Sequence, residues 1–520
     1  MSGARAVVVG LDLGTGGAKA AAYDPRLREW GSAAVEYPMA APRPGWAEQD
    51  PDQVVDAALE ARAATVGQAR AAGARVAGVA LSAAMHSLTA VDGDGHALTP
   101  LLTYADTRAG EQADRLRADP RGAGLHRRTG TPLHPMSPLI KLLWWREHGD
   151  VYARAARWVS AKECLLLRLF GQAVVDHSIA SATGLFNLRQ RGWDRDALAL
   201  VGLDAGRLSE PVATDHVLSG LEHGLAGRLG LDPGTPFVVG AADGCLANLG
   251  AGAVTPGVAA CTVGTSGALR VASTSPRTDP GGRLFTYVLT AARWVSGGPI
   301  STGGLALRWL RDELLADVAA EARRAGQDPY DRLTSLAAAS PPGAEGLLFL
   351  PHLTGERAPR WDADARGVLF GLTLRHRREH LVRAVLEGVA FQLRAVLETL
   401  GDLGVEPHQV RATGGFTRSP LWLQLTADVF GRGLSVPRAG KATLVGAALL
   451  GMVALGLVES LDEAAAAVPV DEVYRPDPQA AGAYGALFAL FEDLHARLEG
   501  SFTQLAQLTG RARAGSRPRS

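Results

Sequence analysis

Two stretches of the chain show the same alternation of apolar and glycine-rich positions. Residues 7–13 form an apolar run interrupted by Asp12, residues 14–17 read Gly-Thr-Gly-Gly, and a run of small and apolar residues continues to residue 23. Residues 259–271 repeat this pattern around a Gly-Thr-Ser-Gly turn at 264–267. The pattern predicts a β-hairpin in each place. The turns begin 264 − 14 = 250 positions apart, which indicates two related halves.

The glycine turns are suited to bind an anion, because a backbone without Cβ atoms lets N–H groups approach a ligand. Thr15 adds a hydroxyl donor, and Asp12, at the end of its strand, is suited to hold Mg²⁺ through water. An ordinary glycine hairpin explains a single turn equally well, so the second copy is what favours phosphate binding. Neither turn has the Gly-x-x-x-x-Gly-Lys-Ser/Thr pattern of a P-loop.

Further apolar runs predict an α/β chain. Apolar residues at helical spacing follow Asp50-Pro51, and others recur from Leu381 to Leu400, so we expect a helix in each place. Residues 76–81 and 235–242 predict buried strands, each followed by polar residues. Ligands of α/β sheets bind beyond the carboxyl ends of such strands.

The polar residues after these strands are candidates for a site. His86 follows the first strand, and a structural histidine is its alternative interpretation. Asp243 follows the second strand, where a carboxylate can accept a proton from a substrate hydroxyl; a helix N-cap is the alternative. Asp106 and Arg108 lie two positions apart on an extended segment, so they share a face that suits a polyhydroxy ligand. A surface ion pair is their alternative.

Two glycine pairs precede helical patterns in the second half. Gly303-Gly304 lead into a segment with Arg308, and Gly414-Gly415 separate a predicted strand from a helix. Both pairs would let a nucleotide approach the backbone, with the adenine ring flat against the second pair. Glycine pairs are common, so they count only as additions to the two hairpins.

Length and composition limit the class of protein. A chain of 520 residues is expected to form two domains. Lys+Arg and Asp+Glu both number 53, which argues against nucleic acid or a charged membrane surface as the main partner. Cys164, Cys245 and Cys261 have no metal-site spacing, so a reduced, cytoplasmic compartment is expected. No signal peptide is expected, because the first apolar run is short and contains Asp12.

Two segments near the end of the chain need separate interpretation. Residues 442–458 carry no charge and approach the length that spans a membrane. They are rich in Ala and Gly rather than Leu and Ile, so we predict a buried helix packed closely on its neighbours. Residues 510–520 are basic with Gly, Ser and Pro, and we assign residues 501–520 to a flexible tail.

Taken together, these motifs resemble those of the FGGY carbohydrate kinases, in the sugar kinase–actin–Hsp70 superfamily. The resemblance extends from about residue 7 to residue 458. Residues 367–372 and 380–387 are similar to the C-terminal signature of the family, and residues 136–144 are similar to its first signature. The resemblance implies two α/β domains of ribonuclease H-like (actin-like ATPase) topology that flank a catalytic cleft. Residues 1–245 would mainly bind sugar and carry the first phosphate hairpin, and residues 246–500 would mainly bind nucleotide.

The resemblance also implies an activity. Several blocks are most similar to family members that phosphorylate gluconate rather than xylulose: residues 82–87, 103–108, 129–138 and 353–359. The implied reaction is transfer from ATP, with Mg²⁺, to the terminal hydroxyl of D-gluconate, giving 6-phospho-D-gluconate. The implied partner is a small sugar acid, and the charge balance gives no reason to expect nucleic acid or membrane. A homodimer is one alternative for the oligomeric state, which the sequence does not determine. D-xylulose or another polyol, and a non-catalytic nucleotide-dependent switch of the actin or Hsp70 type, are the alternatives.

Matching the family motifs position by position implies roles for single residues. Asp243 matches the general base, and Asp12 the metal-associated acid. The substrate-contacting pair matches Met85 and His86. The positions that contact phosphate or nucleotide match Thr15, Gly264, Thr265, Gly304, Arg308, Gly415 and Ser419. Our own candidates for holding the gluconate chain are Asp106, Arg108 and His134, with Arg108 suited to bidentate contact with the carboxylate.

Two positions depart from the family pattern. Gly16 follows Thr15 where a hydroxyl residue is usual, and Gly17 follows in turn, so backbone N–H groups would replace one side-chain contact with phosphate. Tyr104 stands where a Trp is usual, which would alter the wall of the sugar site.

Overall fold

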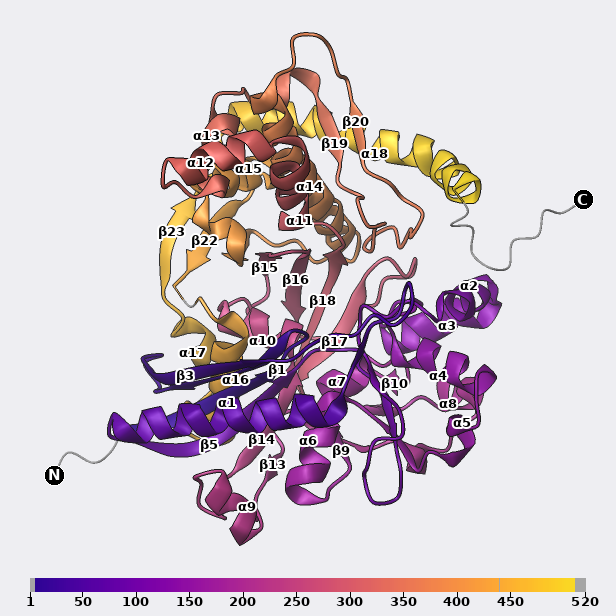
Figure 1. The fold of residues 1–520 in the computed structure, drawn as a ribbon, viewed down its shortest axis with the longest axis vertical. Coiled ribbons are helices and arrows are strands. Elements are labelled where there is room, and N and C mark those ends of the chain that lie inside the picture. Colours follow the sequence, from indigo (N-terminus) through magenta and orange to yellow (C-terminus); the bar gives the residue numbers. More distant parts are fainter. Residues whose placement is uncertain (1–4, 439, 510–520) are drawn as a thin grey trace, which may run out of the picture. The chain divides into compact units, whose positions relative to one another are not determined.

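The computed structural model describes residues 5–438 and 440–509, which form two compact units (Figure 1). The first unit contains the chain up to Pro256, together with Ala272–Ser296 and Lys441–Pro469. The second contains Gly257–Val271, Gly297–Gly440 and the residues from Val470 on. Two segments of the second half of the sequence, 272–296 and 441–469, therefore belong to the first unit.

The first unit is built on a mixed sheet with the strand order β13-β14-β5-β1-β2-β3. β1 pairs antiparallel with β2 and parallel with β5, and β14 pairs parallel with β5. The β1–β2 pair confirms the first predicted hairpin. The strands are β1 (Arg5–Leu13), β2 (Gly17–Tyr23), β3 (Glu29–Glu36), β5 (Ala74–Ala83), β13 (Val217–Leu218) and β14 (Phe237–Ala242).

Six strands of the seven-stranded sheet that contains the strands of the second unit repeat this topology, in the order β18-β16-β15-β21-β22-β23. β15 pairs antiparallel with β16 and parallel with β21, and β21 pairs parallel with β22. The second predicted hairpin is thus confirmed, and both units have the ribonuclease H-like arrangement. The strands are β15 (Val258–Val263), β16 (Gly267–Ser273), β18 (Arg293–Ile300), β21 (Gln409–Thr413), β22 (Gly433–Pro437) and β23 (Val470–Tyr474).

Helices cover the sheet of the first unit. The predicted helix after Asp50 is α1 (Pro51–Ala71); Asp50 caps it by accepting a hydrogen bond from Asp52 N, and Pro51 occupies its first turn. The other helices are α2 (Gly110–Ala118), α3 (Pro120–Thr129), α4 (Pro138–Glu147), α5 (Val151–Arg154), α6 (Ala161–Phe170), α7 (His177–Ser181), α8 (Arg195–Val201), α9 (His223–Arg228), α10 (Asp243–Gly250), α16 (Ala442–Ala454) and α17 (Leu461–Ala466).

The remaining strands of the first unit lie outside its six-stranded sheet. β17 (Phe285–Thr290) lies beside α7, where Val288 N donates to Ser181 Oγ at 3.0 Å. The remaining short strands are β4 (Glu48–Gln49), β6 (Thr89–Val91), β7 (Leu101–Leu102), β8 (Arg157–Val159), β9 (Val174–Asp176), β10 (Phe186–Asn187), β11 (Gly192–Trp193) and β12 (Glu210–Val212).

Helix α16 is the buried helix predicted over residues 442–458. It packs on β1, β5 and α10, and Figure 1 shows it beside the indigo strands despite its late position in the sequence. Residues 444–452 are all buried. Gly10 of β1 allows this approach, since a Cβ there would lie 2.4 Å from Leu444 O. Among residues 5–438 and 440–509, no helix is both long enough and apolar enough to cross a membrane.

The second unit carries long helices on its sheet. The predicted helix over residues 381–400 is α14 (Arg378–Asp402). Residues 501–508, assigned above to a flexible tail, continue α18 (Pro478–Leu508), because Phe502 and Ala506 are buried; residues 510–520 lie outside the described part. The other elements are α11 (Gly304–Trp309), α12 (Ala316–Arg324), α13 (Pro329–Ala338), α15 (Pro420–Phe430), β19 (Leu348–Leu350) and β20 (Val368–Phe370).

Candidate active site

Asp12 lies at the end of β1, beside the first glycine turn. Ser82, its register partner on β5, donates to Asp12 Oδ1 at 2.7 Å. Burial raises the pKa of Asp12, against the Ser82 hydrogen bond and the charges of Lys19 and Lys162, which lower it. A Cβ at Gly14 would lie 3.5 Å from Asp12 Oδ2, so the carboxylate faces the turn. An oxygen ligand in this position fits a divalent cation such as Mg²⁺.

The turn itself is held by side chains from other elements. Tyr37 OH donates to Gly14 O, and Gln49 Nε2 donates to Thr15 O, each at 2.5 Å. Thr15 is half-buried and Gly16 is exposed. A Cβ at Gly16 would meet no atom within 4 Å, so packing does not require glycine at this position. This is the position where the family motif usually has a hydroxyl residue.

Asp243 is the first residue of α10, directly after β14. The N-cap of the helix is Ala242, so the alternative interpretation of Asp243 as the N-cap is wrong. Asp243 Oδ1 accepts a hydrogen bond from Gly244 N at 2.6 Å, and the residue is half-buried. A carboxylate in the first turn of a helix is favourably placed relative to the helix dipole. The side chain is partly accessible at the carboxyl end of β14, where a substrate hydroxyl could approach it.

His86 follows β5 and is buried in a left-handed backbone conformation, with φ 68°. Its Nδ1 lies 2.8 Å from Ala182 O, and because a carbonyl oxygen only accepts, Nδ1 carries the proton. The ring contacts Tyr287 edge-on, with centroids 5.9 Å apart. Met85, beside it, is half-buried. The backbone is strained at this residue, and the hydrogen bond to Ala182 O fixes the tautomer of the ring.

Arg108 and Asp106 form a buried ion pair rather than a surface one. Arg108 Nε donates to both carboxylate oxygens of Asp106, at 2.9 and 3.0 Å, and Arg108 Nη2 donates to Glu48 Oε1 at 2.5 Å. The guanidinium lies 3.6 Å over the Trp46 ring, and only 2% of the arginine side chain is exposed. Asp106 also accepts from Ala47 N at 2.8 Å. The pair fixes the 46–48 segment, and we propose no substrate contact for it.

His134 lies in the loop that enters α4 and is half-buried. Its Nδ1 accepts a hydrogen bond from Met136 N at 3.2 Å, which ties it to the family signature that follows. Sequence reasoning missed two residues of this unit whose side chains bond to the site segments, Lys141 and Lys162. The signal that would have revealed them is the scarcity of lysine in an arginine-rich chain.

In the second unit, a pocket of about 310 Å³ lies where three glycine-containing segments meet: the turn after β15, the start of α11 and the loop after β21. All six nucleotide candidates of the second half line it: Gly264, Thr265, Gly304, Arg308, Gly415 and Ser419. The sequence did not predict the others, which are mainly apolar or come from α13: Val263, Leu305, Leu307, Tyr330, Asp331, Thr334, Phe416, Arg418 and Trp422.

Glycine is required at this junction by backbone contact. Gly304 N donates to Gly264 O at 2.7 Å, and a Cβ at Gly304 would lie 2.8 Å from that oxygen. Gly414 has φ 97°, and a Cβ there would lie 2.5 Å from Val263 O. Ser419 caps α15 by accepting from Trp422 N at 3.2 Å. Glycine at 304 and at 414 therefore lets the start of α11 and the loop after β21 pack directly against the end of β15 and the turn after it. All three segments line the pocket.

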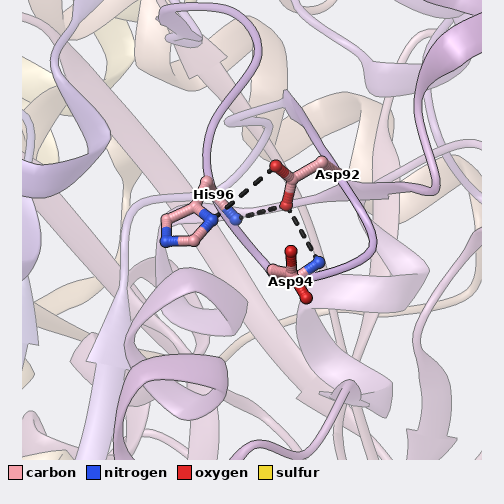
Figure 2. A group of neighbouring side chains, drawn as sticks. All are labelled: Asp92, Asp94 and His96. Carbon is pink, nitrogen blue, oxygen red and sulfur yellow. Dashed lines mark hydrogen bonds and ion pairs between the residues drawn. The ribbon is translucent and has the colours of Figure 1, made fainter.

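A third group of polar side chains lies on the exposed turn after β6. Figure 2 shows Asp92, Asp94 and His96, the one group of metal-ligand type found among the described residues. Asp92 Oδ1 accepts from the backbone N of Asp94 at 3.0 Å and of His96 at 2.9 Å. These hydrogen bonds lower the pKa of Asp92 and account for the cluster as turn structure, so we assign no metal to it.

Comparison with known proteins identifies the family. Residues 7–250 match the N-terminal domain of the FGGY family of carbohydrate kinases, and residues 259–455 match its C-terminal domain. The chain belongs to the FGGY family of carbohydrate kinases. It is therefore a kinase with the two-domain FGGY fold, as the motifs predicted, and the non-catalytic switch has no support.

Similar proteins cover nearly the whole chain. Gluconokinase of Bacillus licheniformis is 40% identical over 501 residues, which are 96% of this chain and 97% of that protein. A xylulose kinase of Bacillus subtilis is 28% identical over 494 residues, covering 94% and 96%. The crystal structure of gluconate kinase from Lactobacillus acidophilus superposes with a TM-score of 0.90 at 32% identity, covering 96% and 99%.

Proposed function

We propose that this FGGY kinase transfers the γ-phosphoryl group of ATP to the terminal hydroxyl of D-gluconate, giving 6-phospho-D-gluconate and ADP. The observation that carries this proposal is the 40% identity with a gluconokinase over nearly the full length, against 28% with a xylulose kinase. D-xylulose remains the second candidate substrate, because the xylulose kinase also matches the chain from end to end.

Asp243 is our candidate for the general base. The substrate hydroxyl oxygen forms a bond to the γ-phosphorus of ATP while the bond from that phosphorus to the β-phosphate oxygen breaks and ADP leaves. A carboxylate oxygen of Asp243 accepts the proton that the attacking hydroxyl loses. Met85, His86 and His134 are the candidates for contact with the sugar acid. His86 supports this role because its Nδ1 proton is held by Ala182 O, which orients the other ring nitrogen.

The pocket of the second unit is the proposed nucleotide site. Backbone at Gly264, Gly304 and Gly415 would contact phosphates, with the Thr265 hydroxyl and the exposed Arg308 as further donors. The apolar lining, which includes Phe416 and Trp422, suits a purine ring. Thr15 is the proposed phosphate contact of the first unit.

Asp12 is the residue that would hold Mg²⁺, directly or through water. The ion, when bound, would neutralise charge on the phosphate oxygens. Its proposed position rests on the carboxylate beside the glycine turn and on the hydrogen bond from Ser82 that orients it.

A substrate panel tests the proposal. Purified protein with ATP and Mg²⁺ is assayed for ADP release with gluconate, xylulose, ribulose and glycerol. We expect kcat/KM for gluconate to exceed that for each other compound by at least about tenfold, since the site's buried polar groups reject substrates that leave them unpaired. The product is identified by ³¹P NMR. A higher kcat/KM for xylulose would replace gluconate with the second candidate.

A further inference from the structure

Lysine is scarce in this chain, and two of its lysines are buried against backbone. The sequence contains Lys19, Lys141, Lys162 and Lys441, against many arginines. Lys141 and Lys162 are 0% and 1% exposed. Each ammonium donates to carbonyl oxygens of segments that carry proposed site residues.

Lys162, on α6, supports the end of β14. Its Nζ donates to Val239 O and to Ala241 O at 3.0 Å each, and to Asp176 Oδ2 at 2.7 Å. The register of β14 against β5 shifts between Val238 and Ala241, the stretch that contains the first of these two carbonyls. Lys162 Nζ therefore bonds to β14 as near as Ala241, two residues before Asp243.

Ser178 completes this support. Ala242 N donates to Ser178 Oγ at 3.1 Å, and Ser178 lies in α7, which Asp176 caps by accepting from Ile179 N at 2.9 Å. The last residues of β14 are therefore bonded to α6 and α7 immediately before the chain turns into α10 at Asp243.

Lys141, on α4, supports a different pair of segments. Its Nζ donates to His86 O at 2.6 Å and to Thr103 O at 2.7 Å, with Leu102 O at 3.4 Å. The His86 carbonyl belongs to the residue in the left-handed conformation after β5. Lys141 thus links the Met85–His86 segment to the segment that carries Tyr104.

The chemistry of these contacts requires lysine. A compact lysine Nζ directs its donors to oxygens on two separate segments, whereas the planar arginine fork directs its donors to one side. This arrangement of donors explains why positions 141 and 162 carry lysine in an arginine-rich chain.

We propose that Lys162 and Lys141 are positioning residues with separate tasks, Lys162 for the Asp243 carboxylate and Lys141 for the sugar-contacting segment at His86. The inference rests on the proposed roles of Asp243 and His86. Loss of Lys162 should then reduce the rate of transfer, and loss of Lys141 should weaken sugar binding.

The test is a comparison of kcat and KM for the sugar in the full chain. We expect K162M to lower kcat by about 100-fold with KM changed less than about threefold, since a small misplacement of a catalytic group has this effect. K141M should raise KM by about tenfold or more, with a smaller effect on kcat. K441M, at an exposed lysine bonded to Glu29, is the matched control and should leave both within about twofold.

If K162M or K141M does not fold, two milder variants test the same roles. S178A removes one hydrogen bond to Ala242 and should lower kcat in the direction of K162M, and K141Q should raise KM in the direction of K141M. Thermal midpoints and ADP affinity are measured for each. The proposal would be overturned if variants at Lys162 and at Lys141 changed kcat and KM to a similar extent, in proportion to the decrease in thermal midpoint. If wild type phosphorylates another sugar and not gluconate, the proposed function fails, and the same comparison with that sugar still tests the lysines.

Discussion

Gly446 of α16 lies directly against Leu246 of α10: a Cβ at Gly446 would be 1.9 Å from Leu246 O. The contact is reciprocal, because a Cβ at Gly250 of α10 would be 1.8 Å from Ala442 O. The backbones of the two helices therefore touch where they cross. Since α10 begins at Asp243, this crossing fixes the direction of the helix that presents the proposed base.

Gly446→Ala should destabilise the protein by about 2 kcal/mol or more, because the added methyl group can be accommodated only by separating the helices. It should also lower kcat. Thermal unfolding and steady-state kinetics measure both effects. Gly482→Ala is the matched control, because Gly482 lies exposed in α18 with open space around it, and it should stabilise by roughly 0.5–1 kcal/mol. Equal thermal midpoints for the two variants would contradict the close crossing.

Asp243→Asn should fold normally and bind ADP, and should lower kcat by about 100-fold or more, because the amide cannot accept the proton. Isothermal calorimetry with ADP and the ADP-release assay separate binding from transfer. Turnover near that of the wild type would remove Asp243 from the mechanism.

Asp12→Asn should raise the Mg²⁺ concentration for half-maximal rate by about tenfold, since the neutral amide is a weaker ligand for a hard cation. A Mg²⁺ titration at saturating ATP measures this. Ser82→Ala is a useful comparison, because it keeps the carboxylate and removes a hydrogen bond that lowers its pKa, so its Mg²⁺ requirement should rise mainly at acidic pH. An unchanged Mg²⁺ requirement in Asp12→Asn would place the metal elsewhere.

Gly16→Ser should be tolerated and should lower KM for ATP by a few-fold, because there is open space at this position and a hydroxyl adds a donor to the turn. Thermal midpoint and KM for ATP are the measurements. Gly14→Ser, where a Cβ would lie 3.1 Å from Gly17 O, should be less stable than Gly16→Ser. A rise in KM for ATP with Gly16→Ser would indicate that the bare backbone is the better phosphate contact.

Lys141 should make stability depend on pH. Burial lowers its pKa from 10.5 to about 7, against the nearby charge of Asp106 and together with that of Arg108. Between about pH 7 and 10.5 the unfolded state then binds more protons than the native state, so the stability of wild type relative to K141M should rise with pH. Thermal midpoints of both proteins at pH 6.5, 8 and 9.5 test this. A difference that is constant or falls with pH would show that Lys141 keeps its proton in the native state.

Local patterns in the sequence were sufficient for the elements that depend on short-range chemistry. The hairpins around residues 14–17 and 264–267, the start of α1 at Asp50-Pro51 and the helix α14 all follow from glycine, capping and apolar periodicity within a few residues. The apolar run before Asp243 likewise predicted that this residue follows the end of a strand.

The roles of charged side chains and glycines were decided only by the tertiary structure, because their partners come from distant parts of the chain. The contacts of Arg108 with Glu48 and with the Trp46 ring join segments about sixty residues apart, so local sequence pattern does not predict them. The proposed role of Lys162 likewise depends on its hydrogen bonds to carbonyl groups of β14, which only the tertiary structure reveals. The sequence of residues 442–458 predicts a buried helix, but its position against α10 depends on close backbone contacts at Gly250 and Gly446, about two hundred positions apart in the sequence. Sequence periodicity reports which face of an element is buried, whereas hydrogen-bond partners and backbone contacts are properties of the assembled fold.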